Sequence, residues 1–186
     1  MQSAFIFLVN TLFSLYLFVL TIRLILAFVG SNYFDPVTQF TLKLTDFLIK
    51  PLRRLIPNVR RVELSTLTCI LVLEIIKFLF FALFSTGFPN LAGIVILAIG
   101  DSLNLLLEAF FYAILLQVII SWVQPMSPIL QTLNLFTSPI MRPLHKIVPT
   151  VGGFDITPIP AIIGIQFLML LIVNPIMATG MSVAFG

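Results

Sequence analysis

Residues 50–57 read Lys-Pro-Leu-Arg-Arg-Leu-Ile-Pro, and residues 142–149 read Arg-Pro-Leu-His-Lys-Ile-Val-Pro, at an offset of 92 positions. The same offset brings further residues into register: Pro36 with Pro128, Thr45 with Thr137, Glu63 with Asp155 and Ser65 with Thr157. Upstream, an offset of 94 pairs Asn10 with Asn104 and Arg23 with Gln117. Chance does not place prolines and basic residues in register, so the chain contains one unit twice.

Long apolar segments flank both copies of this motif. Of 186 residues, 60% are hydrophobic and only 9% are charged, and the mean hydropathy is +1.17. Soluble domains carry roughly 25% charged residues, so the composition is that of an integral membrane protein. Because about 20 apolar residues cross a bilayer, the sequence predicts four spans, at about residues 4–29, 64–84, 102–123 and 161–179.

The ends of these spans are less clearly marked than their centres. Residues 1–3 carry no basic charge and the apolar run after them is too long for a cleaved signal peptide, which predicts a retained first span. Pro89–Gly100 is expected to be a short apolar linker or a re-entrant piece. In the fourth span, Asn174 and Pro175 are expected to kink or end the helix.

The predicted fold is therefore an all-α integral membrane protein. Four transmembrane helices form two parallel two-helix repeats, residues 1–98 and 99–186, related by a pseudo-two-fold axis along the membrane normal. Apolar residues at helical spacing between Val37 and Leu48 predict an amphipathic helix in the lipid interface, or an ordinary loop helix packed on the spans. The second copy, residues 129–141, is less polar and is interrupted by Pro139.

The basic loop motif follows these loop helices in both repeats. Its residues, which we expect to contact lipid or a partner, are Lys50, Pro51, Arg53, Arg54, Pro57, Arg142, Pro143, His145, Lys146 and Pro149. Proline interrupts helices, so the proline pairs are expected to bracket short basic segments that are not continuous helix. Basic loops stay cytoplasmic, which predicts both loops in the cytoplasm and both termini in the periplasm. A five-span alternative would put the two loops on opposite faces.

Four ionisable residues fall inside the predicted spans: Arg23, Glu74, Lys77 and Glu108. Such residues are costly in a membrane and mark pairing or function. Their estimated depths predict two interhelical salt bridges, Arg23 with Glu74 and Lys77 with Glu108, with Asp101 at the outer rim. Two alternatives remain open. The charges could line an ion or proton path, or Arg23 could snorkel to the interface.

The duplicated motif, together with Ser-Trp-Val-Gln-Pro at residues 121–125 and Gly-Gly-Phe-Asp-Ile-Thr-Pro at 152–158, resembles the YggT family of small bacterial membrane proteins. The resemblance covers nearly the whole chain. It implies an inner-membrane protein with two copies of one domain and no established enzymatic activity. It also implies links to osmotic or ionic stress tolerance, to cell-division gene neighbourhoods and, through plastid relatives, to assembly of thylakoid complexes. Two departures are His145, where the family usually has Arg, and residues 58–61, which replace Gly-Gly.

No catalytic or cofactor-binding pattern is present in the sequence. The single His and single Cys lack partners at metal-ligand or nucleophile–base spacing, so we expect no enzyme activity, metal or cofactor. The basic residues gather in loops beside the spans, which favours anionic lipid headgroups over nucleic acid as partners. The first hypothesis is a scaffold or assembly factor that contacts lipid, a second copy or other membrane proteins. The alternative is a small oligomeric transporter or channel component using the intramembrane charges.

Overall fold

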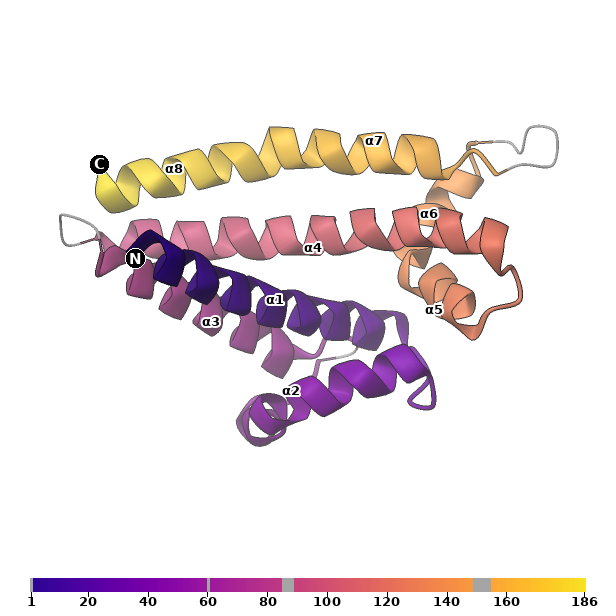
Figure 1. Ribbon diagram of the computed structural model, residues 1–186, viewed down its shortest axis with the longest axis horizontal. Coiled ribbons are helices and arrows are strands. Elements are labelled where there is room, and N and C mark those ends of the chain that lie inside the picture. The colour runs from indigo at the N-terminus through magenta and orange to yellow at the C-terminus, as the bar shows by residue number, and fades with distance from the viewer. Residues whose placement is uncertain (1, 60, 85–88, 149–154) are drawn as a thin grey trace.

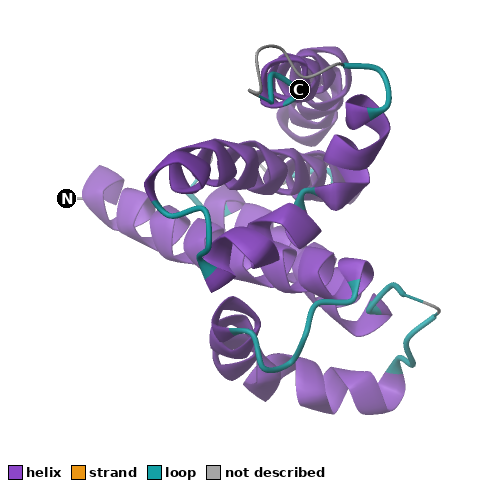
Figure 2. Cartoon of the chain, turned by 90° about the vertical axis from the view of Figure 1, so that its right-hand side faces the viewer, coloured by secondary structure: helices purple, strands orange, loops and turns teal. Residues whose placement is uncertain are grey.

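The computed structural model describes residues 2–59, 61–84, 89–148 and 155–186. Its helices are α1 (Gln2–Val29), α2 (Pro36–Leu55), α3 (Leu64–Ala82), α4 (Leu91–Val123), α5 (Pro128–Phe136), α6 (Ser138–His145), α7 (Pro158–Leu168), the π-helical turn η1 (Met169–Val173) and α8 (Asn174–Phe185). Figure 2 shows helices and loops throughout these ranges. Their one strand-like feature is an isolated bridge between Val59 and Val62.

Four helical segments are long and apolar enough to cross a membrane: Ala4–Val29, Leu64–Ala82, Leu91–Val123 and Pro158–Phe185. They confirm the predicted all-α, four-span fold. Large apolar side chains point outward along them, for example Phe7 on α1, Leu116 on α4 and Phe167 on α7. A soluble protein would bury such side chains, whereas a lipid-facing surface requires them.

The segment predicted as a linker or re-entrant piece belongs instead to α4. The helix begins at Leu91, where the side chain of Asn90 accepts a hydrogen bond from the Ala92 amide (2.9 Å), and it continues without a break to Val123. Within it, Gly93 and Gly100 lie where α4 packs closely on α8. At 33 residues, α4 is about 50 Å long, so it exceeds a hydrocarbon core of about 30 Å and must tilt or protrude.

The four spans run as two parallel pairs (Figure 1). Helices α1 and α4 run in one direction, and α3 and the α7–η1–α8 segment return in the other. The helix α4 is central because it contacts α1, α3, α7 and α8. The loop helices α2, α5 and α6 lie at one end of the bundle, and both termini lie at the other. The two basic loops therefore share one end, as the four-span prediction requires and the five-span alternative does not. The predicted boundary at residues 98 and 99 falls within α4 and stays a prediction.

Two buried apolar clusters hold the repeats together. One joins Leu17 and Leu20 of α1 to Cys69 and Ile70 of α3 and to Ile49 of α2. The other joins α1, α4, α5, α6 and α7, with Ile25, Phe110, Phe136, Met141 and Ile165 among its members. Because α1 contributes to both clusters and Leu105 of α4 belongs to the first, the C-terminal half of α1 packs the first repeat against the second.

The fourth span does not end at Asn174–Pro175. It changes to a π-helical turn over Met169–Val173 and then continues as α8 to Phe185, six residues beyond the predicted end at Thr179. A proline inside a helix clashes with the carbonyl four residues earlier, and a wider π turn is one way that helices absorb such a disruption. Pro175 therefore changes the helix locally without terminating it.

The loop motifs also differ from their predicted form. The helix α2 continues through Pro51 to Leu55, and α6 continues through Pro143 to His145. Arg53, Arg54 and His145 therefore lie on helices, and Lys146 directly follows α6. The prediction that proline brackets keep them off regular helix was wrong. A proline removes one amide hydrogen bond and bends a helix without always ending it, and α2 changes direction near its C-terminal end (Figure 1). In the second loop the break falls at Thr137, between α5 and α6.

Candidate functional site at the loop end of the bundle

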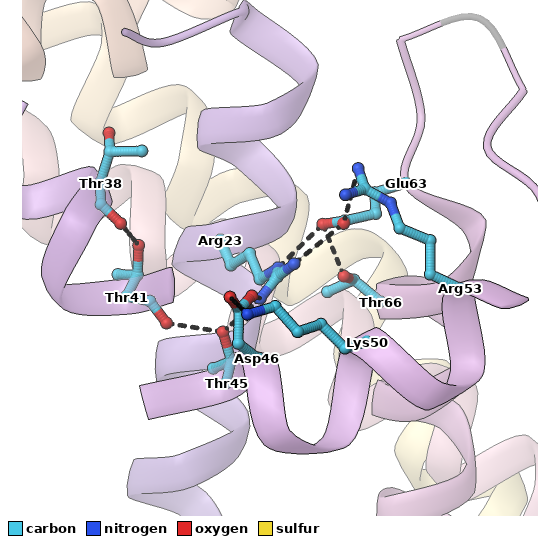
Figure 3. Close-up of polar contacts among 9 residues, drawn as sticks. All are labelled: Arg23, Thr38, Thr41, Thr45, Asp46, Lys50, Arg53, Glu63 and Thr66. Atoms are coloured by element: carbon cyan, nitrogen blue, oxygen red, sulfur yellow. Dashed lines mark hydrogen bonds and ion pairs between the residues drawn. The ribbon is translucent and has the colours of Figure 1, made fainter. Parts of the chain in front are cut away.

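Arg23 is the centre of a buried polar cluster, six residues before the end of α1 (Figure 3). Its Nε donates to Glu63 Oε2 (2.9 Å) and its Nη2 to Glu63 Oε1 (3.1 Å). Its Nη1 donates to Thr45 Oγ1 (2.8 Å) and to Asp46 Oδ1 (2.7 Å). Bidentate guanidinium–carboxylate pairs are among the strongest hydrogen-bonded pairs. Since the side chains of Arg23 and Glu63 are each 4% exposed, this pair fixes α1 against the start of α3.

A second layer of polar groups surrounds this pair. Lys50 Nζ lies 2.9 Å from Asp46 Oδ2, and Arg53 Nη2 lies 3.3 Å from Glu63 Oε1. Thr66 donates from its hydroxyl to Glu63 Oε2 (2.7 Å). Three basic side chains thus meet two carboxylates, and the cluster keeps an excess positive charge. We name these residues the Arg23 cluster: Arg23, Thr45, Asp46, Lys50, Arg53, Glu63 and Thr66.

The helix α2 turns a face of small hydroxyl residues toward the cluster. Thr38, Thr41 and Thr45 are buried, at helical spacing. The hydroxyls of Thr41 and Thr45 donate to the carbonyls of Thr38 (2.8 Å) and Thr41 (2.6 Å), which satisfies them within the helix. Small residues allow helices to approach closely in membranes. Phe40 and Phe47 point outward from the same helix and are mostly exposed.

The first turn of α2 links the two repeats. Asp35 caps the helix, since its carboxylate accepts from the amide of Thr38 (2.8 Å), and Pro36 occupies the first turn, where a missing amide costs nothing. The other oxygen of Asp35 accepts a hydrogen bond from the hydroxyl of Thr132 on α5. The two loop helices therefore hold one another in place.

The carboxylates of the Arg23 cluster outside the spans are stabilised in their charged forms. Burial would raise the pKa of Glu63, but hydrogen bonds from Arg23 and Thr66 and the nearby charges of Arg23 and Arg53 hold that pKa below its ordinary value. Burial likewise opposes ionisation of Asp46, and hydrogen bonds from Lys50 and Arg23 hold the pKa of Asp46 low. Both groups are therefore anionic at neutral pH and neutralise Arg23.

The predicted pair of Arg23 with Glu74 was wrong. Glu74 lies 11 residues beyond Glu63 along the chain, about 16 Å further along α3, whereas Arg23 lies level with the beginning of that helix. The prediction considered only partners inside the second span, and Glu63 lies one residue before that span begins.

Lys77 also has partners other than the predicted Glu108. Its ammonium contacts the carboxylates of Glu74, three residues earlier on α3, and of Asp101 on α4. Asp101 is thus an interhelical partner ten residues inside α4, and the prediction that it lies at the outer rim depended on the misplaced start of that helix. This second charge cluster, Glu74, Lys77 and Asp101, contains two carboxylates for one ammonium.

Glu108 pairs with no cation among the described residues. Its Oε1 accepts from the side-chain amide of Asn104, one turn earlier on α4 (2.9 Å). It lines an open groove between α1 and α4, whose polar lining also includes Asn10, Ser14 and Tyr112. A half-buried carboxylate in a span is costly. The groove is therefore an energetically unfavourable polar region on a surface that is otherwise apolar.

The remaining basic loop residues lie on the surface. Arg54, Arg142 and Lys146 are exposed, and the structure shows no ion pair for them within its described ranges. Pro57 is also exposed, and Pro149 lies outside the described residues. His145 Nε2 lies 2.9 Å from Asp155 Oδ2. The pKa of Asp155 is held below its ordinary value, since hydrogen bonds from Thr157 and His145 outweigh the effect of burial.

The duplicated sequence makes duplicated contacts. Arg53 with Glu63 in the first repeat corresponds to His145 with Asp155 in the second, both at an offset of 92. Arg23 donates to Thr45, and at the corresponding positions Thr137 donates to Gln117 Oε1 (2.6 Å). The second repeat therefore keeps the geometry of the Arg23 cluster without its buried charge.

Sequence reasoning missed the carboxylates that neutralise Arg23. Asp46 and Glu63 were outside the predicted spans and were not considered as partners of a charge inside one. A signal was available, because Glu63 aligns with Asp155 across the repeat, which places a carboxylate before the second span of each unit. In the described parts of the chain, no three His, Cys, Asp or Glu side chains are grouped so that they could hold a metal ion.

The fold and the duplicated polar contacts define a multi-pass membrane protein built from a tandem two-helix unit with a helical loop. The sequence profile of the CCB3/YggT family matches residues 2–84 and again residues 96–176, one segment in each half. The chain belongs to this family.

Relatives in bacteria match over almost their whole length. A Pseudomonas aeruginosa protein described as uncharacterized is 34% identical over 97% of this chain and 94% of its own. A Vibrio alginolyticus protein encoded in the proC 3' region is also 34% identical, over 87% of this chain and 89% of its own. The YggT protein of Escherichia coli K12 is 30% identical over 94% of this chain and 92% of its own. No solved structure matches the chain.

Proposed function

We propose that this chain is a non-enzymatic scaffold or assembly factor of the bacterial inner membrane, which contacts anionic lipid through basic loops on the cytoplasmic face. Family resemblance suggests a role in tolerance of osmotic or ionic stress. Partner membrane proteins or a second copy would be organised around this lipid-anchored end. The observation that carries the proposal is that the structure places both basic loops at one end of the bundle.

The Arg23 cluster supports this role by fixing the first loop rigidly. It holds α2 so that Phe40 and Phe47 face outward, while Lys50, Arg53 and Arg54 follow on the same helix. Outward aromatic rings next to basic residues suit the boundary between acyl chains and anionic headgroups. A loop held in one conformation loses little entropy on binding lipid, so its affinity depends mainly on charge.

Replacing Lys50, Arg53 and Arg54 together by Gln should reduce the enrichment of anionic lipid around the protein. Each basic residue near an anionic leaflet contributes about 1 kcal/mol, and less where it is already ion-paired, as Lys50 and Arg53 are. We expect a severalfold lower ratio of anionic to zwitterionic lipid co-purifying in nanodiscs. High salt should mimic the substitution. Arg142→Gln with Lys146→Gln should have a smaller effect, because only two charges are removed. If the ratio of anionic to zwitterionic lipid does not change with these substitutions or with salt, the proposed lipid contact is refuted.

The orientation can be tested with single cysteines in a Cys69→Ser background. Basic loops are retained in the cytoplasm, and the first loop contains six Lys or Arg residues: Lys43, Lys50, Arg53, Arg54, Arg60 and Arg61. A cysteine at Gly186 should react from the periplasm with a membrane-impermeant maleimide in intact cells. A cysteine at Lys43 should react only after lysis. Labelling of the Lys43 position in intact cells would show that the first loop is periplasmic and would contradict the proposed orientation.

A second candidate function, as a component of an oligomeric ion transporter or channel, is favoured by one observation. Glu74, Asp101 and Glu108 place three carboxylates along α3 and α4 against the one ammonium of Lys77. Intramembrane carboxylates are typical of ion and proton pathways. Ion flux into proteoliposomes should then fall at least tenfold on Glu74→Gln or Glu108→Gln. Flux equal to that of protein-free liposomes in the unsubstituted protein would exclude this candidate.

A further inference from the structure

A cavity of about 360 Å³ lies beside the Arg23 cluster, between the end of α1, the first half of α2 and the loop before α3. Its volume is within the range of small-molecule sites, about 300–1,000 Å³. Three guanidinium groups line it, from Arg23, Arg53 and Arg61, with one carboxylate, that of Glu63. The cavity is therefore electropositive.

The single carboxylate in the lining is already occupied. Both oxygens of Glu63 accept hydrogen bonds from Arg23, and Arg53 and Thr66 contact them as well. Arg61 differs from Arg23 and Arg53, because the structure shows no ion pair for it within the described residues. Arg61 is exposed where it lines the cavity, so its guanidinium is free to bind an anionic ligand there.

The backbone before α3 holds Arg61 at the cavity. Val59 and Val62 exchange two backbone hydrogen bonds (3.2 and 3.0 Å), which hold Arg61 in a tight turn. Ser31 and Thr38 also line the cavity, but the Thr38 hydroxyl donates to Asp35 Oδ2 (3.0 Å) and lies 2.5 Å from the Ser31 hydroxyl, so these two hydroxyls are already hydrogen-bonded. Guanidinium groups bind phosphate oxygens, so Arg61 and Arg53 are the available ligands.

The residues that line the cavity indicate its depth relative to the membrane. The lining residues Leu26, Ala27 and Gly30 belong to the last turn of the first span and the residue after it. Tyr33, which also lines the cavity, and Phe34 are largely exposed beside it. Aromatic residues at the end of a span mark the membrane–water interface, where phospholipid phosphates lie.

We propose that this cavity binds a single phosphate-bearing anion, with Arg61 and Arg53 as its cationic ligands. The phosphate belongs to an anionic phospholipid headgroup or is free. The inference rests on the proposed function insofar as it places the loop end at headgroup level. It goes further, because it assigns one saturable site and gives Arg61 a specific role in binding that the other exposed basic residues do not have.

The test measures the thermal stability of the full chain in zwitterionic detergent at 0.15 M salt, where charges further apart than about 8 Å are screened. The probes are short-chain phosphatidylglycerol, short-chain phosphatidylcholine and inorganic phosphate. We expect saturable stabilisation by phosphatidylglycerol and at least about tenfold weaker apparent affinity in Arg61→Gln, with Arg61→Lys recovering part of it. Stabilisation by inorganic phosphate alone, with equal sensitivity to Arg61→Gln, would identify free phosphate as the ligand.

Lys43→Gln is the matched control. Lys43 is an exposed basic residue on α2 that does not line the cavity and is not part of the basic loop motif, so its substitution removes one positive charge and should change the apparent affinity less than twofold. Equal effects of Lys43→Gln and Arg61→Gln would overturn the site and leave the proposed lipid contact intact. Charge-independent lipid enrichment in the nanodisc experiment would instead refute the proposed function, while saturable binding of inorganic phosphate would still support the site.

Discussion

Glu63→Gln should lower the stability of the protein more than any other single substitution at the loop end. It leaves the guanidinium of Arg23 buried with Asp46 as its one remaining carboxylate. Removing one partner of a buried ion pair costs about 3–5 kcal/mol, and we expect the lower part of that range because Asp46 remains. Thermal unfolding in detergent should show a correspondingly lower midpoint.

The repeat supplies the control for this prediction. Asp155 occupies the equivalent position, but its side chain is 40% exposed and pairs with His145, itself 43% exposed. Exposed pairs contribute about 0–1 kcal/mol, so Asp155→Asn should have little effect. Arg23→Gln combined with Glu63→Gln should be less damaging than the sum of the two single changes. Additive losses would contradict the pairing.

Acid should weaken the same contacts. The pKa of Glu63 is lowered in the folded protein from an ordinary value of 4.5, and that of Asp46 from 3.8. A lowered folded-state pKa contributes stability that is complete above the ordinary value and is lost as the pH falls through the lowered one. Unfolding midpoints should therefore be level near neutral pH and fall below about pH 4.5. In Glu63→Gln this decline should be shallower.

Gly93→Ala should give the second large loss, by forcing α4 away from α8. A β-carbon at Gly93 would lie 2.3 Å from the backbone nitrogen of Ala184 and 2.5 Å from its α-carbon. Backbone atoms cannot move aside as a flexible side chain does, so the two helices must separate. Overpacking costs about 1–3 kcal/mol, and we expect the upper end of that range in the thermal unfolding of purified protein.

Gly164→Ala is the matched control for this substitution. Gly164 also lies in a span, on α7, but a β-carbon there meets no atom within 4 Å. Alanine favours helix over glycine by up to about 1 kcal/mol, so Gly164→Ala should be neutral or stabilising. Gly180→Ala should fall between the two, because its nearest neighbours include the side chain of Leu97. Equal unfolding midpoints for all three variants would show that α4 and α8 do not pack through glycine.

The fold was predictable because its determinants are contiguous in the sequence. Apolar runs of about 20 residues define the spans, and the repeat at offset 92 defines the parallel halves. The start of α4 was not predictable in the same way, because its apolar run of 33 residues is longer than one span requires and was divided into a linker and a span. Likewise, Pro51 and Pro143 lie inside helices, although proline disfavours the interior of a helix.

The polar site was only partly predictable, for a geometric reason. Arg23, Glu74 and Lys77 were expected to be buried and paired, and they are. The partners of Lys77 were mispredicted because α4 begins at Leu91 and not near residue 102, which moves Asp101 into the span. Arg23 pairs with Glu63, 40 residues later, and not with Glu74, because its partner lies just before the second span and not inside it.

The order in which the chain is synthesised gives the Arg23 contacts a further consequence. Arg23 leaves the ribosome 23 residues before Asp46 and 40 before Glu63. At about 5–20 residues per second, α1 carries an unneutralised guanidinium for about one to five seconds before Asp46 emerges, and for about two to eight seconds it lacks Glu63. Its position near the loop end leaves that charge within reach of water until α2 and α3 arrive and close over it. The second half has Gln117 at this position, so its first span enters the membrane with no charge waiting there for a partner.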